Sequence, residues 1–465
     1  MHDLLKATKK TKLSLTDYDF QEDIKNRLLL KRLNKDSLLV LEEILCNTPK
    51  FPVESLAEDL ELPVDTLYKI IDSLVPLNLF QFDGRFLTVD KDKRKYFEAQ
   101  ITRFEDDFKP DLDFFQNLLK SLPIEVLPNW YHVPRTSNNI FQSIIEKHLF
   151  TPQVYQRYFI EFSSGNDIIS QIISKLFNSP KLKLYVKPLL KEFDLSPEEF
   201  EEIVLHLEFN ILAFVSFEQE HEILTPLYEW QQYQLFLKDS TPLSATDEVQ
   251  ALRKYEYAFI QDMSDLINLA ATTPLELFYN REKETWAPTT PTQTLIETHL
   301  GAPKKYIAKL IDKLLILGLA IIEKELLIPT KAAQEWQEIP ITQRAHITFK
   351  HPHNFLSTQK SYPLATQRVI IEIQKSLSLV KTLSWVLFDD FLKGSLIPLS
   401  EDRQVSLKKT GRNWAYALPQ YTKEERDFIE YIVCDWLFES GVTQIGKVDG
   451  QTAFKLTSLG KSIVI

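Results

Sequence analysis

Four lysines in one short amphipathic stretch have the type and spacing to bind a phosphate backbone. In the stretch 302–317 they are accompanied by a single acid, Asp312; the lysines are Lys304, Lys305, Lys309 and Lys313. Residues at i, i+4 and i+8 share one face of a helix, so the last three would present their ammonium groups together. Such a face suits the charge of nucleic acid. A solvated lysine face that balances an acidic neighbouring domain would produce the same pattern, and both interpretations stay open.

A second basic cluster precedes two aromatic residues, Trp414 and Tyr416. Its members are Arg403, Lys408, Lys409 and Arg412. Cations beside aromatic rings can hold a single strand of nucleic acid by charge and stacking. The alternative is a charged hairpin whose aromatic side chains point into the core.

Residue patterns that would support catalysis are weak. His346, His351 and His353 lie near one another, but no cysteine or patterned carboxylate joins them, which argues against a metal site. Asp389 and Asp390 are adjacent, so on a helix they point about 100° apart and do not converge for acid–base chemistry. No nucleophile-elbow or zinc-protease pattern and no glycine-rich phosphate loop occurs. We therefore expect no enzyme, no cofactor and no small-molecule substrate.

Length and charge restrict the class of protein further. The 465 residues are enough for roughly three or four domains. A formal net charge of −11 lowers the expectation of extensive nucleic-acid contact and raises that of a protein partner, although a local basic patch can suffice. Cys46 and Cys434 lie in apolar runs and are expected to be buried, reduced thiols. With no signal-peptide pattern and no membrane-length apolar run, the expected location is the cytoplasm, without membrane contact.

One local pattern recurs along the chain and is expected to position the basic clusters. In the stretch 64–75, Leu67, Ile70, Ile71 and Leu74 have the i, i+3, i+4, i+7 spacing of a packed helix. Asp83-Gly84 follows as a hairpin turn. Helix, helix, turn, helix and hairpin is the order of a winged helix-turn-helix domain.

Similar stretches follow further along. Ser196 and Pro197 open the third helix of a second copy, and a β-run over 213–224 would be its wing. The predicted fold is mainly α with small β-wings, an α+β array of tandem winged helices. Its predicted parts are an N-terminal arm (1–36), winged helix 1 (37–100), an aromatic and proline-rich helical connector (101–165), winged helix 2 (166–260), winged helix 3 (261–340) and a C-terminal winged-helix-like domain (341–465).

The ends of the later copies carry a more particular resemblance. Leu317-Gly318-Leu319 leading to Leu327-Ile328-Pro329-Thr330 resembles the last helix and wing of the winged-helix superfamily. The stretch 436–442, the pair Asp449-Gly450 and the stretch 453–460 resemble helicase-associated segments of certain bacterial proteins, which are similar to the N-terminal region of XPB-type helicases. This resemblance implies a role linked to nucleic acid. It does not imply helicase activity, because no helicase motor motif occurs in the chain.

The third helix of a winged helix is the usual reader of the major groove. The first candidate, 64–74, has a nearly neutral outer face. The second, 196–208, would expose glutamates that repel phosphate, which excludes it as a reader; they are Glu198, Glu199, Glu201, Glu202 and Glu208. Only the stretch 302–317 has a suitable charge.

Two functions remain after these arguments. The first is a non-catalytic, nucleic-acid-associated regulatory protein that contacts DNA or RNA through the two basic clusters. The alternative is a protein–protein interaction scaffold of winged helices without direct DNA contact, which the charge of −11 and the glutamate-rich helix favour. In that case the aromatic residues around Trp130 and Tyr131 would form a partner surface, unless they pack in the core.

Overall fold

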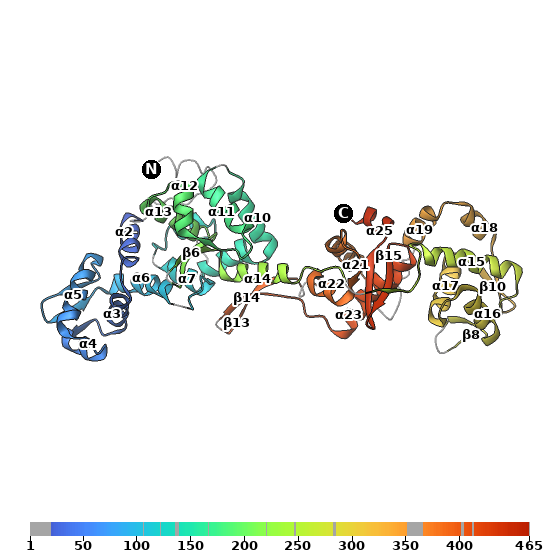
Figure 1. The fold of residues 1–465 in the computed structure, drawn as a ribbon, viewed down its shortest axis with the longest axis horizontal. Helices are drawn as coiled ribbons and strands as arrows, with labels where there is room; N and C mark the ends of the chain where they lie inside the picture. The colour runs from blue at the N-terminus through green and yellow to red at the C-terminus, as the bar shows by residue number, and fades with distance from the viewer. Residues whose placement is uncertain are drawn as a thin grey trace. The chain divides into compact units, whose positions relative to one another are not determined.

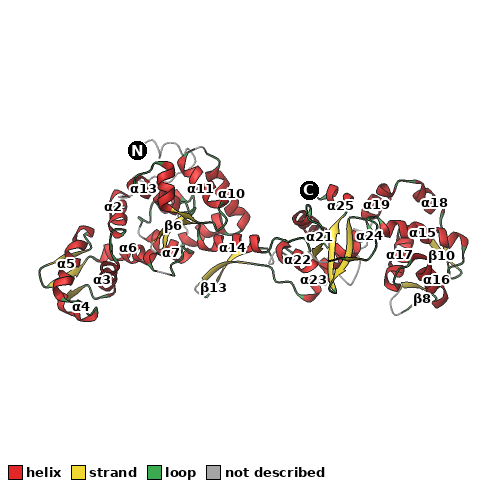
Figure 2. Ribbon diagram, in the orientation of Figure 1, coloured by secondary structure: helices red, strands yellow, loops and turns green. Residues whose placement is uncertain are grey.

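Small antiparallel sheets flanked by helices recur along the chain, which confirms the predicted class of a mainly helical α+β protein (Figure 1, Figure 2). The computed structural model describes residues 20–105, 107–120, 122–134, 139–165, 167–219, 221–245, 248–281, 285–350, 366–400, 404–411 and 413–464. Two units are present. The first takes in the chain up to Phe236 together with Ser406–Ala417, and the second comprises Leu237–Val405 and Leu418–Ile465.

The recurring arrangement is a helix, a short strand, two further helices and an antiparallel hairpin. In three of the four arrangements the last strand lies between the other two, so that it pairs with the first strand as well as with its hairpin partner. We call each recurrence a module, and we call the helix before its hairpin the third helix. Two modules lie in the first unit and two in the second.

The first module follows helix α2 (Phe20–Leu30). Its first helix is capped by the side chain of Asn34, which accepts the backbone N–H of Ser37. Asp83 Oδ1 accepts the N–H of Phe86 at 2.7 Å and holds the hairpin turn. The elements are α3 (Lys35–Cys46), β1 (Lys50–Pro52), α4 (Val53–Asp59), α5 (Val64–Leu74), η2 (Val75–Leu77), β2 (Phe80–Phe82) and β3 (Phe86–Val89), with sheet order β1-β3-β2.

The second module has the same order, and its third helix begins where the sequence predicts. Ser196 and Glu199 form a reciprocal capping box at that start. The hairpin covers the stretch predicted to be a wing. The elements are α11 (Ile168–Asn178), β4 (Leu184–Tyr185), α12 (Val186–Phe193), α13 (Pro197–Phe209), β5 (Phe214–Glu218) and β6 (His221–Thr225), with sheet order β4-β6-β5.

Helices and one distant hairpin complete the first unit. Trp130 and Tyr131 are 6% and 3% exposed, so they belong to the core and do not form a partner surface. The hairpin β13–β14, which the sequence places in the C-terminal domain, belongs to this first unit. The elements are α6 (Lys91–Ile101), η3 (Thr102–Phe104), α7 (Leu112–Lys120), α8 (Leu127–Trp130), α9 (Ile140–Ile144), η4 (Ile145–Leu149), α10 (Pro152–Ser163), the larger part of α14 (Tyr228–Asp239), β13 (Ser406–Thr410) and β14 (Asn413–Ala417).

The third module opens the second unit and carries an extra hairpin, β8–β9, after its first helix. A single bridge between Glu276 and Leu326 takes the place of the first strand. The elements are α15 (Ala258–Thr272), β8 (Leu277–Asn280), β9 (Thr285–Pro288), α16 (Thr290–Leu300), α17 (Lys304–Ile316), β10 (Ala320–Glu323), β11 (Leu326–Pro329), α18 (Lys331–Glu338) and α19 (Ile341–Lys350).

The fourth module has an interrupted third helix that contains a π-helical turn, η7. A short strand from earlier in the unit, β7 (Gln250–Ala251), extends its sheet to the order β12-β16-β15-β7. The elements are α21 (Gln367–Ser376), η5 (Leu377–Val380), β12 (Val386–Leu387), α22 (Phe388–Ser395), α23 (Lys423–Glu430), η7 (Tyr431–Trp436), α24 (Leu437–Glu439), β15 (Thr443–Val448), β16 (Gln451–Leu456) and α25 (Ser458–Ile463). Within the residues described, no helix has the length and apolar character needed to cross a membrane.

Candidate functional site

The third helix of the third module, α17, carries the four lysines predicted to bind phosphate. Its apolar side, with Ile307, Leu310 and Leu314, is fully buried in the core of the unit. Lys304 and Lys305 stand in the first turn of the helix and are exposed. These two lysines are therefore placed as a phosphate contact requires.

The other two lysines of α17 contact the fourth module, Lys309 at a surface where its side chain is still 38% exposed and Lys313 in a buried position. Lys309 pairs with the carboxylate of Asp435. Lys313 Nζ lies 2.6 Å from Glu439 Oε2, and the two side chains are only 10% and 9% exposed. Two lysines one helical turn apart thus meet two acids one helical turn apart. The prediction that Lys309 and Lys313 contact phosphate does not fit this placement, because both ammonium groups already have carboxylate partners.

Apolar and acidic groups surround this contact between α17 and the third helix of the fourth module. The ring of Phe438 lies 6.1 Å from that of Tyr306 and 6.0 Å from that of Phe259. Burial raises the pKa of Glu439, which Lys313 opposes. Burial also raises the pKa of Asp312 to about 6, with a further contribution from Glu439. The contact therefore has the composition of a protein interior, with its acids desolvated.

The second basic cluster lies on the hairpin β13–β14. Lys408 and Lys409 are exposed on β13, and Lys409 Nζ lies 3.7 Å from Asp113 and 5.5 Å from the ring centre of Trp414. Tyr416 is buried, and its hydroxyl donates to the carbonyl of Leu149 at 2.9 Å. The hairpin thus presents its lysines to solvent and turns Tyr416 into the core of the first unit. Two further members of the predicted cluster, Arg403 and Arg412, lie outside the described residues.

The glutamate-rich third helix of the second module, α13, differs from the prediction. Glu201 and Glu208 are 2% and 0% exposed, so they do not belong to a solvated face. Glu201 pairs with Lys31, which follows directly after α2, and Glu208 pairs with Arg27 of α2 and Arg103 of η3.

The electrostatics of Glu208 explain how its charge is tolerated. Burial on its own would raise the pKa of Glu208, but the two guanidinium groups of Arg103 and Arg27 bring it down to about 2. These cations come from residues more than 100 positions earlier in the chain, which no local pattern on α13 reveals.

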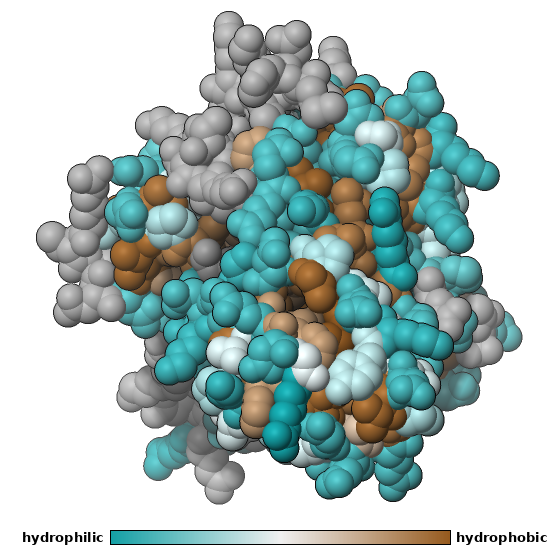
Figure 3. All heavy atoms as spheres, turned by 90° about the vertical axis from the view of Figure 1, so that its left-hand side faces the viewer, coloured by the Kyte–Doolittle hydropathy of each residue, from teal (hydrophilic) through white to brown (hydrophobic). Residues whose placement is uncertain are grey.

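The third helix of the first module, α5, has an outer face that is exposed along its length. Asp65, Lys69 and Asp72 lie along it, with Val64 and Val75 exposed near its two ends. Figure 3 views the molecule from the side on which α5 lies in Figure 1, and hydrophobic residues are visible there between hydrophilic ones. The face is nearly neutral, as predicted from the sequence.

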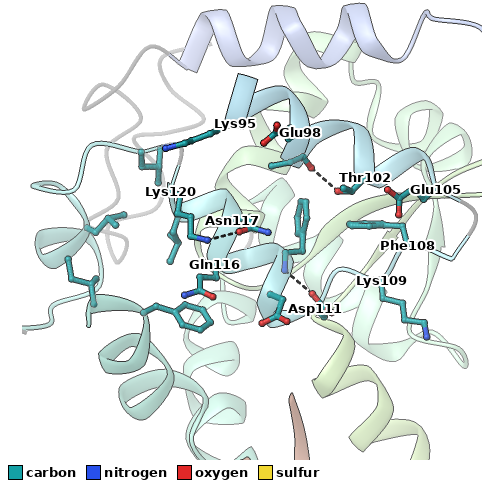
Figure 4. A pocket seen from close by; sticks show the side chains of 18 of the residues that line it. Lys95, Glu98, Thr102, Glu105, Phe108, Lys109, Asp111, Gln116, Asn117 and Lys120 are labelled. Carbon is teal, nitrogen blue, oxygen red and sulfur yellow. Dashed lines mark hydrogen bonds between the residues drawn. The ribbon is translucent and has the colours of Figure 1, made fainter. Parts of the chain in front are cut away.

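A groove of about 1130 Å³ runs beside α6 and α7 in the first unit (Figure 4). The sequence patterns do not indicate it. Five carboxylates and three lysines line it, together with amide and apolar side chains; the charged residues are Lys95, Glu98, Glu105, Asp107, Lys109, Asp111, Asp113 and Lys120. Burial raises the pKa of Glu105 and of Asp111, and neighbouring acids add to both shifts. An excess of carboxylates makes the groove unsuitable for a phosphate chain.

The structure brings together no group suited to metal chemistry among the residues it describes. His346 lies exposed on α19, while His351 and His353 are outside the described residues. Asp389 and Asp390 are both exposed, and Asp389 pairs with Arg426 at 2.7 Å. In comparisons with known proteins, no family model and no curated protein matches this chain.

Proposed function

We propose that the four modules are winged helices and that the protein is a non-catalytic scaffold in which these modules dock on one another and on a protein partner. The order of elements supports the winged-helix assignment, and so does the position of the last strand between two others in three of the four modules. The short hairpin after each third helix corresponds to the wing. This assignment agrees with the resemblance seen at the ends of the later copies.

The observation that carries the scaffold proposal is the use of third helices as internal contacts. In the first unit, Glu208 of α13 forms buried ion pairs with Arg27 of α2 and Arg103 of η3, and Glu201 pairs with Lys31, which follows α2. In the second unit, α17 meets the third helix of the fourth module through Lys309–Asp435 and Lys313–Glu439. Part of the surface that a winged helix would place in a DNA groove is thus occupied by protein in these helices, while the first turn of α17 stays exposed.

The free energy of breaking their buried ion pairs opposes the binding of nucleic acid by these helices. Removing one member of a buried ion pair from the other costs about 3–5 kcal/mol. A phosphate backbone that took Lys313 as its partner would have to compensate for that loss once, because Glu439 would be left buried and unpaired. The exposed outer face of α5 has no such cost, and we assign it the contact with the partner.

A site-specific cross-linking experiment tests the proposal. A photoreactive amino acid at Thr66, exposed on α5, is expected to form adducts with a protein in cells that produce the full chain. The matched control carries it at Ser462, which is also exposed. Adducts with nucleic acid at Thr66, or equal labelling at both positions, would contradict the scaffold.

A second candidate function, nucleic-acid binding, is favoured by one specific observation. Lys304 and Lys305 are exposed in the first turn of α17, the part of a recognition helix that commonly contacts base edges. Lys408 and Lys409 offer a second exposed basic pair. Under this function, the double variant Lys304→Glu with Lys305→Glu lowers the affinity for DNA and reduces its dependence on salt. Unchanged affinity and salt dependence would remove this candidate.

A further inference from the structure

The contact between α2 and α13 leaves buried hydrogen-bond donors without an acceptor among the described residues. Arg27 donates from Nε to Asp23 Oδ1 at 2.8 Å and from Nη1 to Glu208 Oε2 at 2.9 Å. Its remaining nitrogen, Nη2, is buried and has no acceptor in the described part of the chain. A buried donor without an acceptor costs about 1–3 kcal/mol, and more when the group is charged.

Arg103 has the same deficit. Its Nη2 donates to Glu208 Oε2 at 2.9 Å, while Nη1 donates to Glu208 Oε1 and, at 3.2 Å, to the carbonyl of Val215. The third nitrogen, Nε, is buried without an acceptor among the residues described. Gln100, on the adjacent α6, adds a buried and unpartnered amide nitrogen, Nε2. All three side chains are at most 4% exposed.

These three residues line the same small cavity. Its volume is about 20 Å³, and the remaining wall includes Lys31, Glu201 and the apolar side chains of Leu30, Phe104, Val215 and Phe217. A buried water needs roughly 10–15 Å³ and between two and four polar partners. The cavity, which is partly open to solvent, therefore has the size of one water molecule, is lined by the three residues whose donors lack an acceptor, and includes a carboxylate, Glu201, that can receive a hydrogen bond in return.

We propose that this cavity is a binding site for one structural water molecule, which accepts hydrogen bonds from among Arg27 Nη2, Arg103 Nε and Gln100 Nε2. A water oxygen accepts two hydrogen bonds, and its own hydrogens can be donated to Glu201. Through it, α2, α6, η3 and α13 share one hydrogen-bonded network, so the water is part of the contact that holds the second module's third helix.

The charge of the cluster argues for water over a monatomic anion. Three cations, Arg27, Lys31 and Arg103, face four carboxylates, which are Asp23, Glu201, Glu208 and Glu222. The formal sum is −1, so a chloride ion would add repulsion to a region that already has an excess of negative charge. A neutral acceptor satisfies the donors without that penalty.

Crystallography of the full chain tests this site directly. The expected result is one well-occupied density peak within hydrogen-bond distance of at least two of the three named nitrogens, without anomalous signal in crystals grown from sodium bromide. Two outcomes would overturn the proposal. One is a bromide peak at this position, which would make it an anion site. The other is a cavity closed by direct contact of the arginines with protein acceptors.

A measurement in solution tests independently whether the site holds water or an anion. The melting temperature is expected to stay the same when chloride is replaced by gluconate at constant ionic strength, whereas an anion site predicts a fall. In the variant Gln100→Leu, the water peak is expected to shift or lose occupancy because one donor is gone. The matched control, Gln81→Leu on the exposed side of β2, leaves the peak unchanged. Equal water density in both variants would show that Gln100 does not belong to the site.

Discussion

Lys313 provides the sharpest test of how α17 contacts the fourth module. In the variant Lys313→Met, the hydrocarbon stem is roughly preserved while the ammonium group is lost, so Glu439 stays buried without its partner. The folded protein can escape the full cost by protonating Glu439. From its ordinary pKa of 4.5, protonation at pH 7 costs 1.36 kcal/mol for each of 2.5 units, or about 3.4 kcal/mol. We expect a loss of about 3 kcal/mol at pH 7.

The destabilisation caused by Lys313→Met is expected to depend on pH because Glu439 can take up a proton. A folded carboxyl with a raised pKa binds more protons than the unfolded one, so stability falls as pH rises. At pH 5 the protonation cost shrinks to about 0.7 kcal/mol. The destabilisation caused by Lys313→Met is therefore expected to fall below about 1 kcal/mol at pH 5.

Native-state hydrogen exchange of peptides from α17 and α24 measures this local stability. A loss of 3 kcal/mol corresponds to roughly a hundredfold loss of protection at pH 7, after correction for intrinsic exchange. The control is Lys305→Met on the exposed side of the same helix, expected to stay within about 0.5 kcal/mol of the native protein. Equal effects of the two variants, or a loss at Lys313 that does not depend on pH, would refute the buried contact.

Two further carboxylates of the first unit have predicted effects of opposite sign. Glu208→Gln removes the shared partner of Arg27 and Arg103. Acid titration of the native protein should show about 3 kcal/mol of stability lost as pH falls from 4.5 through the folded pKa of about 2. Urea unfolding that is equal for both proteins at pH 6 would contradict this. Burial raises the pKa of Glu229 to about 8 while its Oε1 accepts the N–H of Leu112, so the native protein should lose stability as pH rises from about 4.5 towards 8. In the variant Glu229→Gln this fall in stability with rising pH should be absent. The melting temperatures of the variant at pH 6 and pH 8 should therefore be closer together than those of the native protein, and an equal difference in both proteins would contradict the prediction.

The local structure was predictable from the sequence because its signals are local. The spacing of Leu67, Ile71 and Leu74 marks the buried face of α5, and these residues are fully buried. Ser196 with Glu199 marks the start of α13, and Asp83-Gly84 marks a hairpin turn, as found. In each case the interacting groups are within a few residues of one another.

The partners of charged side chains were not predictable in the same way. Lys313 and Glu201 occur on amphipathic helices where charge normally indicates solvent, yet each meets a counter-charge more than 100 residues distant. A single sequence does not indicate which charged faces meet. The hairpin 406–417 differs from its predicted domain for a related reason, because Tyr416 packs against residues of the first unit, Trp230 and Tyr233.

The most direct test of the scaffold is a titration of labelled duplex DNA and single-stranded RNA with the full chain, followed by fluorescence anisotropy at about 50 and 200 mM salt. Because Lys309 and Lys313 are held by acids, we predict a Kd weaker than about 10⁻⁴ M at the higher salt, beyond ordinary non-specific binding. A Kd of about 10⁻⁸ M that is lost in the variant Lys304→Glu with Lys305→Glu would contradict the account.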